Sequence, residues 1–353
     1  MKSVNLKELA QELNLSISTV SKALRDNYEI GQETKERVKK LAQELNYEPN
    51  PYASSLRRKK SKTIGVVIPE VSNNFFSQAI NGIEEVAREN DYHVLIYLTN
   101  ESYSRELTIT HHLASGRVDG ILMSIASETQ DYAHLKELTS KNIPMVFFDR
   151  VCDELATAKV TTNDFQSGYM ATQHLIEAGC RCIAHLLISS NLSIGQKRMQ
   201  GYVKALEDYG ITCDESLIIN GDRTDAENRE TMKQLLHSRP EIDGIFASVE
   251  RLAMSSYEAC KELNIAIPNQ IKIISFSNLY VASLLDPALT TITQPAYSIG
   301  KEAARILFKS LDKNKPVLET QSLELSSELI KRKSTAVNYS RFKNGVAVRA
   351  WIS

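Results

Sequence analysis

A set of aromatic, guanidinium and polar side chains, most of them placed just after apolar runs, marks this 353-residue chain. Phenylalanine rings cover the apolar face of a sugar or a base, while an arginine fork and asparagine or aspartate side chains fix its hydroxyl groups. The chemistry that these residue types favour is therefore the binding of a small polar molecule. The candidate binding residues are Asn74, Phe75, Phe76, Arg150, Asp164, Arg198 and Ser277.

Each of these residues also has a simpler structural explanation. A double phenylalanine such as Phe75-Phe76 is more often part of a core, and an Asp-Arg pair such as Asp149-Arg150 often lies on a surface. Asn163-Asp164 has the composition of a helix cap. The residue types alone leave both interpretations open.

Catalytic chemistry finds little support in the sequence. The chain lacks the glycine patterns of nucleotide-binding loops and the G-x-S-x-G pattern of a hydrolase nucleophile. His111 and His112 are adjacent rather than four residues apart, so on a helix they point to different faces and do not suit zinc. The five cysteines are scattered and form no C-x-x-C pair, which is typical of reduced thiols. The sequence predicts no enzyme, no cofactor and no bound metal.

The region after Lys62 alternates apolar runs with amphipathic segments, which predicts a mostly parallel sheet built from βα units. Its first half contains expected strands at 63–68, 93–98 and 120–124 and expected helices at 77–90 and 105–115. Its second half contains expected helices at 166–178, 195–209, 228–238 and 255–263 and expected strands at 183–188, 244–247 and 271–276. Two similar lobes fit this length. Ligands of such sheets bind beyond the carboxyl ends of the strands, where most of the candidate residues stand.

The 42 basic and 43 acidic side chains are unevenly distributed along the chain. Residues 1–62 hold 13 basic and 8 acidic side chains, which leaves 29 basic and 35 acidic for the rest. A small cationic head before an acidic body indicates that the head meets a polyanion. We find no apolar run long enough for a membrane helix and no secretory apolar core, so we expect a cytoplasmic protein with no membrane contact.

The cationic head has the pattern of three short helices around one small core. Asn5 begins a capping-box pattern, Ser16 can cap the second helix, and the third helix spans about 33–45. In a helix-turn-helix pair, the second helix lies in the DNA major groove and its outward residues read base edges and phosphates. By position these are Ser16, Ile17, Ser18 and Lys22. The simpler alternative is that Ile17 belongs to the core and Lys22 is merely solvated.

Four segments of the head together resemble the lactose-repressor (LacI/GalR) family of transcription regulators. They are 4–10, 15–24, 33–38 and 46–50, and the resemblance continues through 64–69, 147–150, 198–206 and 289–295 to about residue 335. The family usually has Ala-Gly at the interhelical turn where this chain has Leu13-Asn14. Asparagine is the next residue best able to adopt a left-handed conformation, so we expect the turn to be kept.

The resemblance implies that the body looks like a periplasmic sugar-binding protein, with two lobes joined by three crossovers and an effector in the cleft. The effector-contacting positions of the family fall here on Phe75, Arg150, Asp164 and Arg198. Asn163 stands where an aspartate is usual, and Ser277 stands where many members have the aspartate that anchors effector hydroxyls or amines. The missing carboxylate weakens the case for a simple neutral sugar.

The residues after the third helix predict a new short helix. Pro49 blocks helix continuation and Asn50 can cap a new turn, so a helix is expected over 51–58. It exposes Leu56 without a core of its own, so alone it should be unfolded. The resemblance implies a hinge helix that folds on operator DNA, with Leu56 wedged into a minor-groove base step. The alternative for the basic run 57–60 is an ordinary solvated linker.

We therefore predict an all-α helix-turn-helix head followed by a two-lobed α/β sensor domain like a periplasmic binding protein. The expected bounds are 1–48 for the DNA-binding head, 49–62 for the hinge helix and linker, 63–335 for the effector-binding and dimerisation domain, and 336–353 for a tail that lacks leucine heptads and is compatible with disorder. The expected DNA-binding residues, by position and by resemblance, are Ser16, Ile17, Ser18, Thr19, Ser21, Lys22, Asn50, Ala53, Leu56 and Arg57.

The function predicted from these features is that of a sequence-specific repressor that binds a palindromic operator in double-stranded DNA as a homodimer. A small metabolite in the cleft, a sugar or a related compound, would control its operator affinity. One alternative is a regulator of the same fold without a small-molecule effector, controlled by a protein corepressor. A remote alternative is a cytoplasmic sugar-binding or sugar-processing protein.

Overall fold

A computed structural model describes residues 5–45, 47, 61–221, 223–313, 317 and 319–337. Contacts between residues divide the chain into two units, residues 1–61 and residues 62–353. The expected hinge helix at 51–58 and the tail from residue 338 onward lie outside the described residues. Among the helices of the described segments, each is too short or too polar to span a membrane.

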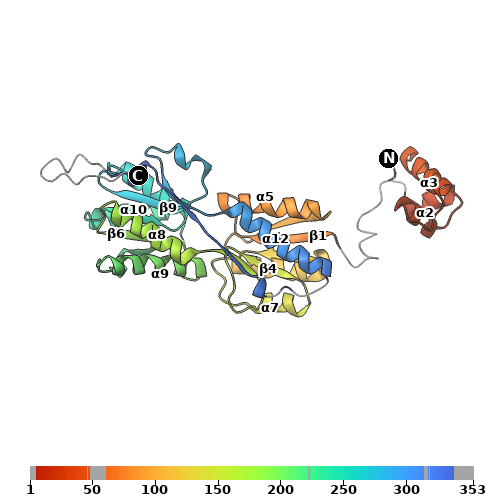
Figure 1. The fold of residues 1–353 in the computed structure, drawn as a ribbon, viewed down its shortest axis with the longest axis horizontal. Coiled ribbons are helices and arrows are strands. Elements are labelled where there is room, and N and C mark those ends of the chain that lie inside the picture. Colours follow the sequence, from red (N-terminus) through yellow and green to blue (C-terminus); the bar gives the residue numbers. More distant parts are fainter. Residues whose placement is uncertain are drawn as a thin grey trace, which may run out of the picture. The chain divides into compact units, whose positions relative to one another are not determined.

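The first unit is a bundle of three helices (Figure 1). They are α1 (Leu6–Glu12), α2 (Ile17–Leu24) and α3 (Gln32–Glu44). Their apolar faces meet in one cluster that includes Leu9, Val20 and Val38. The Asn5 side chain caps α1 in a complete capping box, as predicted. Asn14 has φ 55°, so the expected left-handed turn between α1 and α2 is confirmed.

The second unit contains two six-stranded sheets, each at the centre of one lobe (Figure 1). The first sheet, in the order β11-β5-β4-β3-β1-β2, consists of β1 (Thr63–Ile68), β2 (His93–Leu98), β3 (Gly120–Met123), β4 (Met145–Phe148), β5 (Lys159–Thr162) and β11 (Leu323–Leu325). The second sheet, in the order β12-β10-β9-β8-β6-β7, consists of β6 (Ile183–Leu187), β7 (Ile218–Asn220), β8 (Gly244–Ala247), β9 (Lys272–Phe276), β10 (Thr290–Thr293) and β12 (Glu328–Ile330). The ladders are parallel except between β10 and β12, so the predicted parallel α/β lobes are confirmed.

Helices flank both sheets. The first lobe carries α5 (Asn74–Glu89), α6 (Tyr103–His112), the π-helical η1 (Leu113–Arg117), α7 (Ala133–Ser140) and α12 (Ala296–Lys313). The second lobe carries α8 (Asp164–Glu177), α9 (Ser193–Asp208), α10 (Asp225–Ser238) and α11 (Glu250–Glu262), and the short 3-10 turns are η2 (Glu215–Leu217), η3 (Tyr280–Ser283), η4 (Glu319–Gln321) and η5 (Lys333–Thr335). The chain passes between the lobes from β5 to α8, from β10 to α12 and from β11 to β12, which are the three crossovers that the resemblance implies.

Several helices begin earlier than the sequence predicts. The first helix of the body, α5, begins at Asn74 rather than residue 77 because the Asn73 side chain caps it. Similarly, α11 begins at Glu250 rather than residue 255. Each helix opens with a polar residue, Asn74 or Glu250, ahead of its first buried apolar residue. The first turns nevertheless carry buried apolar residues, so the predicted starts lie too late. The difference matters because both first turns reach the space between the lobes.

Two helix pairs, one in each lobe, cross closely at glycines. A Cβ atom on Gly82 of α5 would lie 2.1 Å from the Tyr297 carbonyl oxygen of α12. A Cβ atom on Gly168 of α8 would lie 2.4 Å from the Arg198 carbonyl oxygen of α9. A side chain at either position would push two backbones apart. The second contact sets the distance between α8 and α9 at the level of Arg198.

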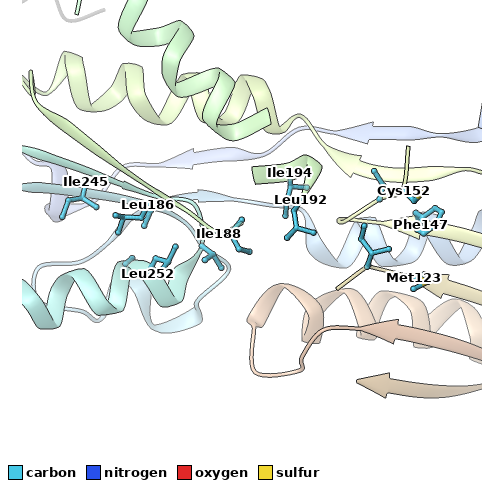
Figure 2. Packing of buried hydrophobic residues seen from close by; sticks show 14 of the residues in the cluster. Met123, Phe147, Cys152, Leu186, Ile188, Leu192, Ile194, Ile245 and Leu252 are labelled. Carbon is cyan, nitrogen blue, oxygen red and sulfur yellow. The ribbon is translucent and has the colours of Figure 1, made fainter. Parts of the chain in front are cut away.

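One apolar cluster extends across both lobes (Figure 2). Phe147 and Cys152 of the first lobe belong to it, together with Ile188, Leu192 and Ile194 of the second. The last three residues lie at the end of β6 and the start of α9, next to the space between the lobes. The lobes therefore meet through packed apolar side chains as well as through the three crossovers.

Candidate functional site

A cavity of about 360 Å³, counting its open mouth, lies between the two lobes. The first lobe contributes residues from the end of β4 and the start of α5, and the second contributes residues from α9 and from the ends of β6, β8 and β9. The cavity thus lies beyond the carboxyl ends of the strands, where the sequence predicts a ligand site.

Five of the seven candidate residues line this cavity, namely Phe75, Phe76, Arg150, Arg198 and Ser277. Asn74 and Asp164 are not among its lining residues. Each of them instead forms a hydrogen bond with a residue that lines the cavity. Asn74 binds Glu250, and Asp164 binds Arg198. Phe76 is also buried and packs edge to face against Phe148, with ring centroids 6.4 Å apart, so its core role and its place in the cavity wall coexist.

Arg198 of α9 is held from three sides in the second lobe. Its Nε donates to the Asp164 carboxylate at 2.7 Å, and its Nη1 donates to the Ser248 carbonyl oxygen at 2.7 Å. The guanidinium lies 3.7 Å from the centre of the Phe276 ring, a cation–π contact. Both ionised partners are buried, and Nη2 of Arg198 has no hydrogen-bond partner in the described structure. The free Nη2 is a donor available to a ligand.

Arg150 at the end of β4 is held in a similar way in the first lobe. Its Nη1 donates to both carboxylate oxygens of Glu101, at 2.8 and 2.7 Å, and its guanidinium lies 5.7 Å from the Phe76 ring centre. Burial alone would raise the pKa of Glu101, but the Arg150 charge and hydrogen bonds hold that pKa below its ordinary value. Nε of Arg150 has no hydrogen-bond partner in the part of the chain described, and it lies 3.9 Å from the Asp149 carboxylate.

Asp149 places a second carboxylate in the cavity wall beside Arg150. It has φ 59°, which aspartate tolerates better than most residues, and the left-handed backbone directs the chain across the end of β4. Burial raises the pKa of Asp149 to about 6, against the opposing effect of the Arg150 and Arg198 charges. This carboxylate therefore loses its proton close to neutral pH.

Glu250 connects the two lobes across the cavity. One of its carboxylate oxygens accepts hydrogen bonds from the backbone and side-chain nitrogens of Asn74, at 3.2 and 3.0 Å. Its other oxygen accepts the Ser277 hydroxyl at 2.8 Å. Gln78 and Asn278 form a further pair between the lobes, at 3.2 and 3.3 Å. The protein's own side chains thus bridge the cleft.

Sequence reasoning missed Glu101 and Glu250. The rule that selects residues after a strand also selects Glu250 once it is applied to the run 244–247, so a usable signal existed. Glu101 stands three residues after the run 93–98, so the same rule selects it as well. Ser277 stands where many family members have an aspartate, so the sequence suggests that the site lacks this carboxylate. The Glu250 carboxylate, which accepts the Ser277 hydroxyl, supplies one next to that position.

The outward face of α2 is the candidate nucleic-acid interface of the head. Ser16, Ile17 and Ser18 are exposed. Ile17 has 46% of its surface exposed, so the alternative that it belongs to the core is wrong. Ser16 caps α2 by accepting the Thr19 N–H at 3.0 Å. The exposed isoleucine and hydroxyls leave this face free to approach a partner.

Two further candidates on α2 already have partners within the head. Lys22 forms an ion pair with Glu29, and Ser21 hydrogen-bonds to Arg25. Both ends of the Lys22–Glu29 pair are partly exposed, so water screens it and the lysine can exchange partners at small cost. The remaining DNA-binding candidates, Asn50, Ala53, Leu56 and Arg57, lie outside the described residues.

The fold and the two sites together define a helix-turn-helix protein with a two-lobed ligand-binding body. Residues 5–50 match the family described as bacterial regulatory proteins of the lacI family, and residues 61–333 match the periplasmic binding proteins and sugar binding domain of the LacI family. The chain belongs to the LacI family. The prediction of a DNA-binding transcription regulator with an effector-binding body is confirmed, and members of this family are transcription regulators.

Three relatives illustrate the likeness. The ribose operon repressor of Halalkalibacterium halodurans is 31% identical over 330 residues, which cover 94% of this chain and 96% of that protein. The structure of the regulator CelR in complex with cellobiose has 25% identity and a TM-score of 0.71, covering 94% of this chain and 99% of that chain. A LacI family regulator of Enterococcus faecium with bound ribose has 27% identity and a TM-score of 0.68, and the match covers 78% of this chain and 99% of that chain.

The raised pKa of Asp149 predicts a pH-dependent effect of the Asp149→Asn substitution. The folded protein holds this proton more tightly than the unfolded chain does, because the pKa is about 6 in the fold and 3.8 ordinarily. Ionisation of Asp149 therefore lowers the free energy of unfolding of the wild type between about pH 4 and pH 7, by up to about 3 kcal/mol. Asparagine also tolerates a positive φ, so the variant should fold.

Urea unfolding of the wild type and of Asp149→Asn at both pH values measures this difference. We expect the stability of the variant relative to the wild type to rise from about pH 4 to pH 7. If the difference in free energy of unfolding between the variant and the wild type is the same at both pH values, then Asp149 has the same pKa in the folded protein as in the unfolded chain, which contradicts the prediction.

Proposed function

We propose that the protein is a cytoplasmic, homodimeric repressor that binds a palindromic operator in double-stranded DNA. Its affinity for the operator falls or rises when a sugar or a related metabolite enters the cleft. The observation that carries the proposal is the cavity between the lobes, whose aromatic and arginine side chains come from several strand ends. The relatives support it, since one is named as an operon repressor and two were solved with bound sugars.

The proposed division of labour follows the predicted bounds. Residues 1–48 read the operator, residues 49–62 form the hinge, residues 63–335 sense the metabolite, and residues 336–353 form a tail. A ligand that contacts both lobes can bind one arrangement of the lobes more tightly than the other. The difference between the two binding free energies sets how far the ligand shifts the equilibrium between the arrangements. The hydrogen bonds of Glu250 and Gln78 across the cleft are the contacts that such a ligand has to replace or strengthen.

An exposed apolar turn supports a homodimer. Tyr280, Val281 and Leu284, in and beside η3, have 88%, 41% and 75% of their surfaces exposed. Contiguous exposed apolar side chains of this size mark interaction sites. We propose that a second copy covers them, because one recognition helix reads only a few base pairs and two-fold pairing doubles the contacts on a palindrome.

Selection of bound duplexes from a random DNA pool by the full chain tests the proposal. We expect an enriched palindrome, and we expect the Leu284→Lys variant to enrich at most a single half-site because a charge at this turn opposes pairing. Enrichment of no duplex would refute the DNA-reading function. An enriched palindrome that Leu284→Lys recovers equally well would refute only the placement of the interface.

Lys22 should contribute one phosphate or base contact on the enriched operator. Replacing it with alanine removes one released counterion, so the slope of log affinity against log salt should become shallower by about 0.9. Titrations of operator DNA at several salt concentrations measure the slope. Lys261→Ala, an exposed lysine on α11 of the body, is the matched control and should leave the slope unchanged. An equal slope for Lys22→Ala and the wild type would exclude Lys22 from the interface.

A further inference from the structure

The charged groups around the cavity carry information about the ligand beyond its general class. Four ionisable side chains line the cavity: Asp149, Arg150, Arg198 and Glu250. Among the lining residues in the described chain there is no lysine and no histidine. The two arginines are thus the only cations in the wall that could attract an anionic ligand.

Both arginines are already neutralised by carboxylates of the protein. Glu101 holds Arg150 through two contacts of 2.8 and 2.7 Å, and Asp164 holds Arg198 at 2.7 Å. Neither carboxylate is among the residues that line the cavity, so a ligand does not displace them to reach the arginines. Arginines in a cleft commonly bind phosphate or carboxylate groups through paired donors. Here a carboxylate of the protein already balances the charge of each guanidinium.

Each arginine keeps donors that its carboxylate does not use, and Nε of Arg150 lies 3.9 Å from the Asp149 carboxylate. Nε of Arg150 and Nη2 of Arg198 are buried and have no hydrogen-bond partner in the described structure. A hydroxyl or carbonyl oxygen satisfies one N–H donor of this kind. A phosphate favours a site with net positive charge, and the arginines, each paired with a carboxylate, do not provide that charge.

Glu250 adds a carboxylate that no cation neutralises. It is 9% exposed, and no lysine or arginine nitrogen of the described chain forms an ion pair with it. It accepts three hydrogen bonds from Asn74 and Ser277, and the amino ends of α5 and α11 give partial positive charge nearby. With Glu101, Asp149 and Asp164, the cavity and its immediate support hold four carboxylates against two guanidinium groups.

We propose that the effector is a neutral or amine-bearing polyhydroxyl compound and that phosphorylated or carboxylated metabolites are excluded from the cleft. Its hydroxyl or ammonium donors face Glu250 and Ser277, and its oxygen acceptors face Arg150 and Arg198. The proposal rests on the proposed function, since it concerns the ligand of the same cleft. Glu250 is the specificity-determining residue, because it supplies the unpaired negative charge that repels an anion.

Calorimetric titration of the full-length protein with matched compounds tests the charge rule. The probes are D-ribose with ribose 5-phosphate, and D-glucose with D-glucosamine and glucose 6-phosphate, followed by cellobiose. We expect the uncharged or amine-bearing member of a set to bind at least about tenfold more tightly than its phosphate. A phosphate that binds as tightly as its parent sugar, or more tightly, would overturn the inference and leave the proposed function intact.

The Glu250→Gln variant tests the residue itself. Glutamine keeps the size and the acceptor oxygen for Asn74 but removes the charge, so the preference for the parent sugar over its phosphate should fall by about threefold or more. Glu258→Gln, an exposed position on the same helix, is the matched control and should leave the preference unchanged. Thermal melting of both variants checks that they fold.

Two outcomes separate the inference from the proposed function. An unchanged preference in a folded Glu250→Gln variant would overturn the role of Glu250. If no probe binds and no neutral metabolite alters operator binding, the small-molecule part of the proposed function fails, and the inference about the ligand fails with it.

Discussion

The buried ion pair between Arg198 and Asp164 is the interaction on which the second lobe's side of the cleft depends. It joins α9 to α8, and the same guanidinium also binds the Ser248 carbonyl oxygen after β8 and stacks on Phe276 of β9. The pair is possible because Gly168 lets the two helix backbones approach at the level of Arg198. Desolvation of both ions is costly, and only good geometry with additional hydrogen bonds offsets it. One arginine therefore fixes four elements around the cavity.

The first lobe repeats this arrangement with different residues. Arg150 stands at the end of β4, is held by Glu101 and lies beside the Phe76 ring. In both lobes an aromatic ring and a carboxylate hold the guanidinium in place before any ligand enters. The cleft therefore offers prepared hydrogen-bond donors but little free positive charge, and this combination suits hydroxyl-rich ligands better than anionic ones.

The sequence predicts most of the architecture because periodicity and strand ends report on the backbone. The three helices of the head, the two parallel sheets and five of the cavity-lining residues follow from local patterns and from one resemblance. The helix starts are less predictable, since Asn74 and Glu250 are polar first residues that stand ahead of the first buried apolar residue of their helices. Glu101 follows a strand end, but its pairing with Arg150 could not be predicted, because the contact joins residues 49 positions apart through a loop whose conformation depends on the folded lobe.

A double-mutant cycle on the Arg198–Asp164 pair tests the central claim most directly. The free energy of unfolding is measured for the ligand-free wild type, Asp164→Asn, Arg198→Gln and the double variant. Each single substitution leaves one buried charge without its partner and should cost about 3–5 kcal/mol. The double variant should be at least about 2 kcal/mol more stable than the sum of the two losses predicts. Additive losses would contradict the account, because the two side chains would then be stabilised independently of each other.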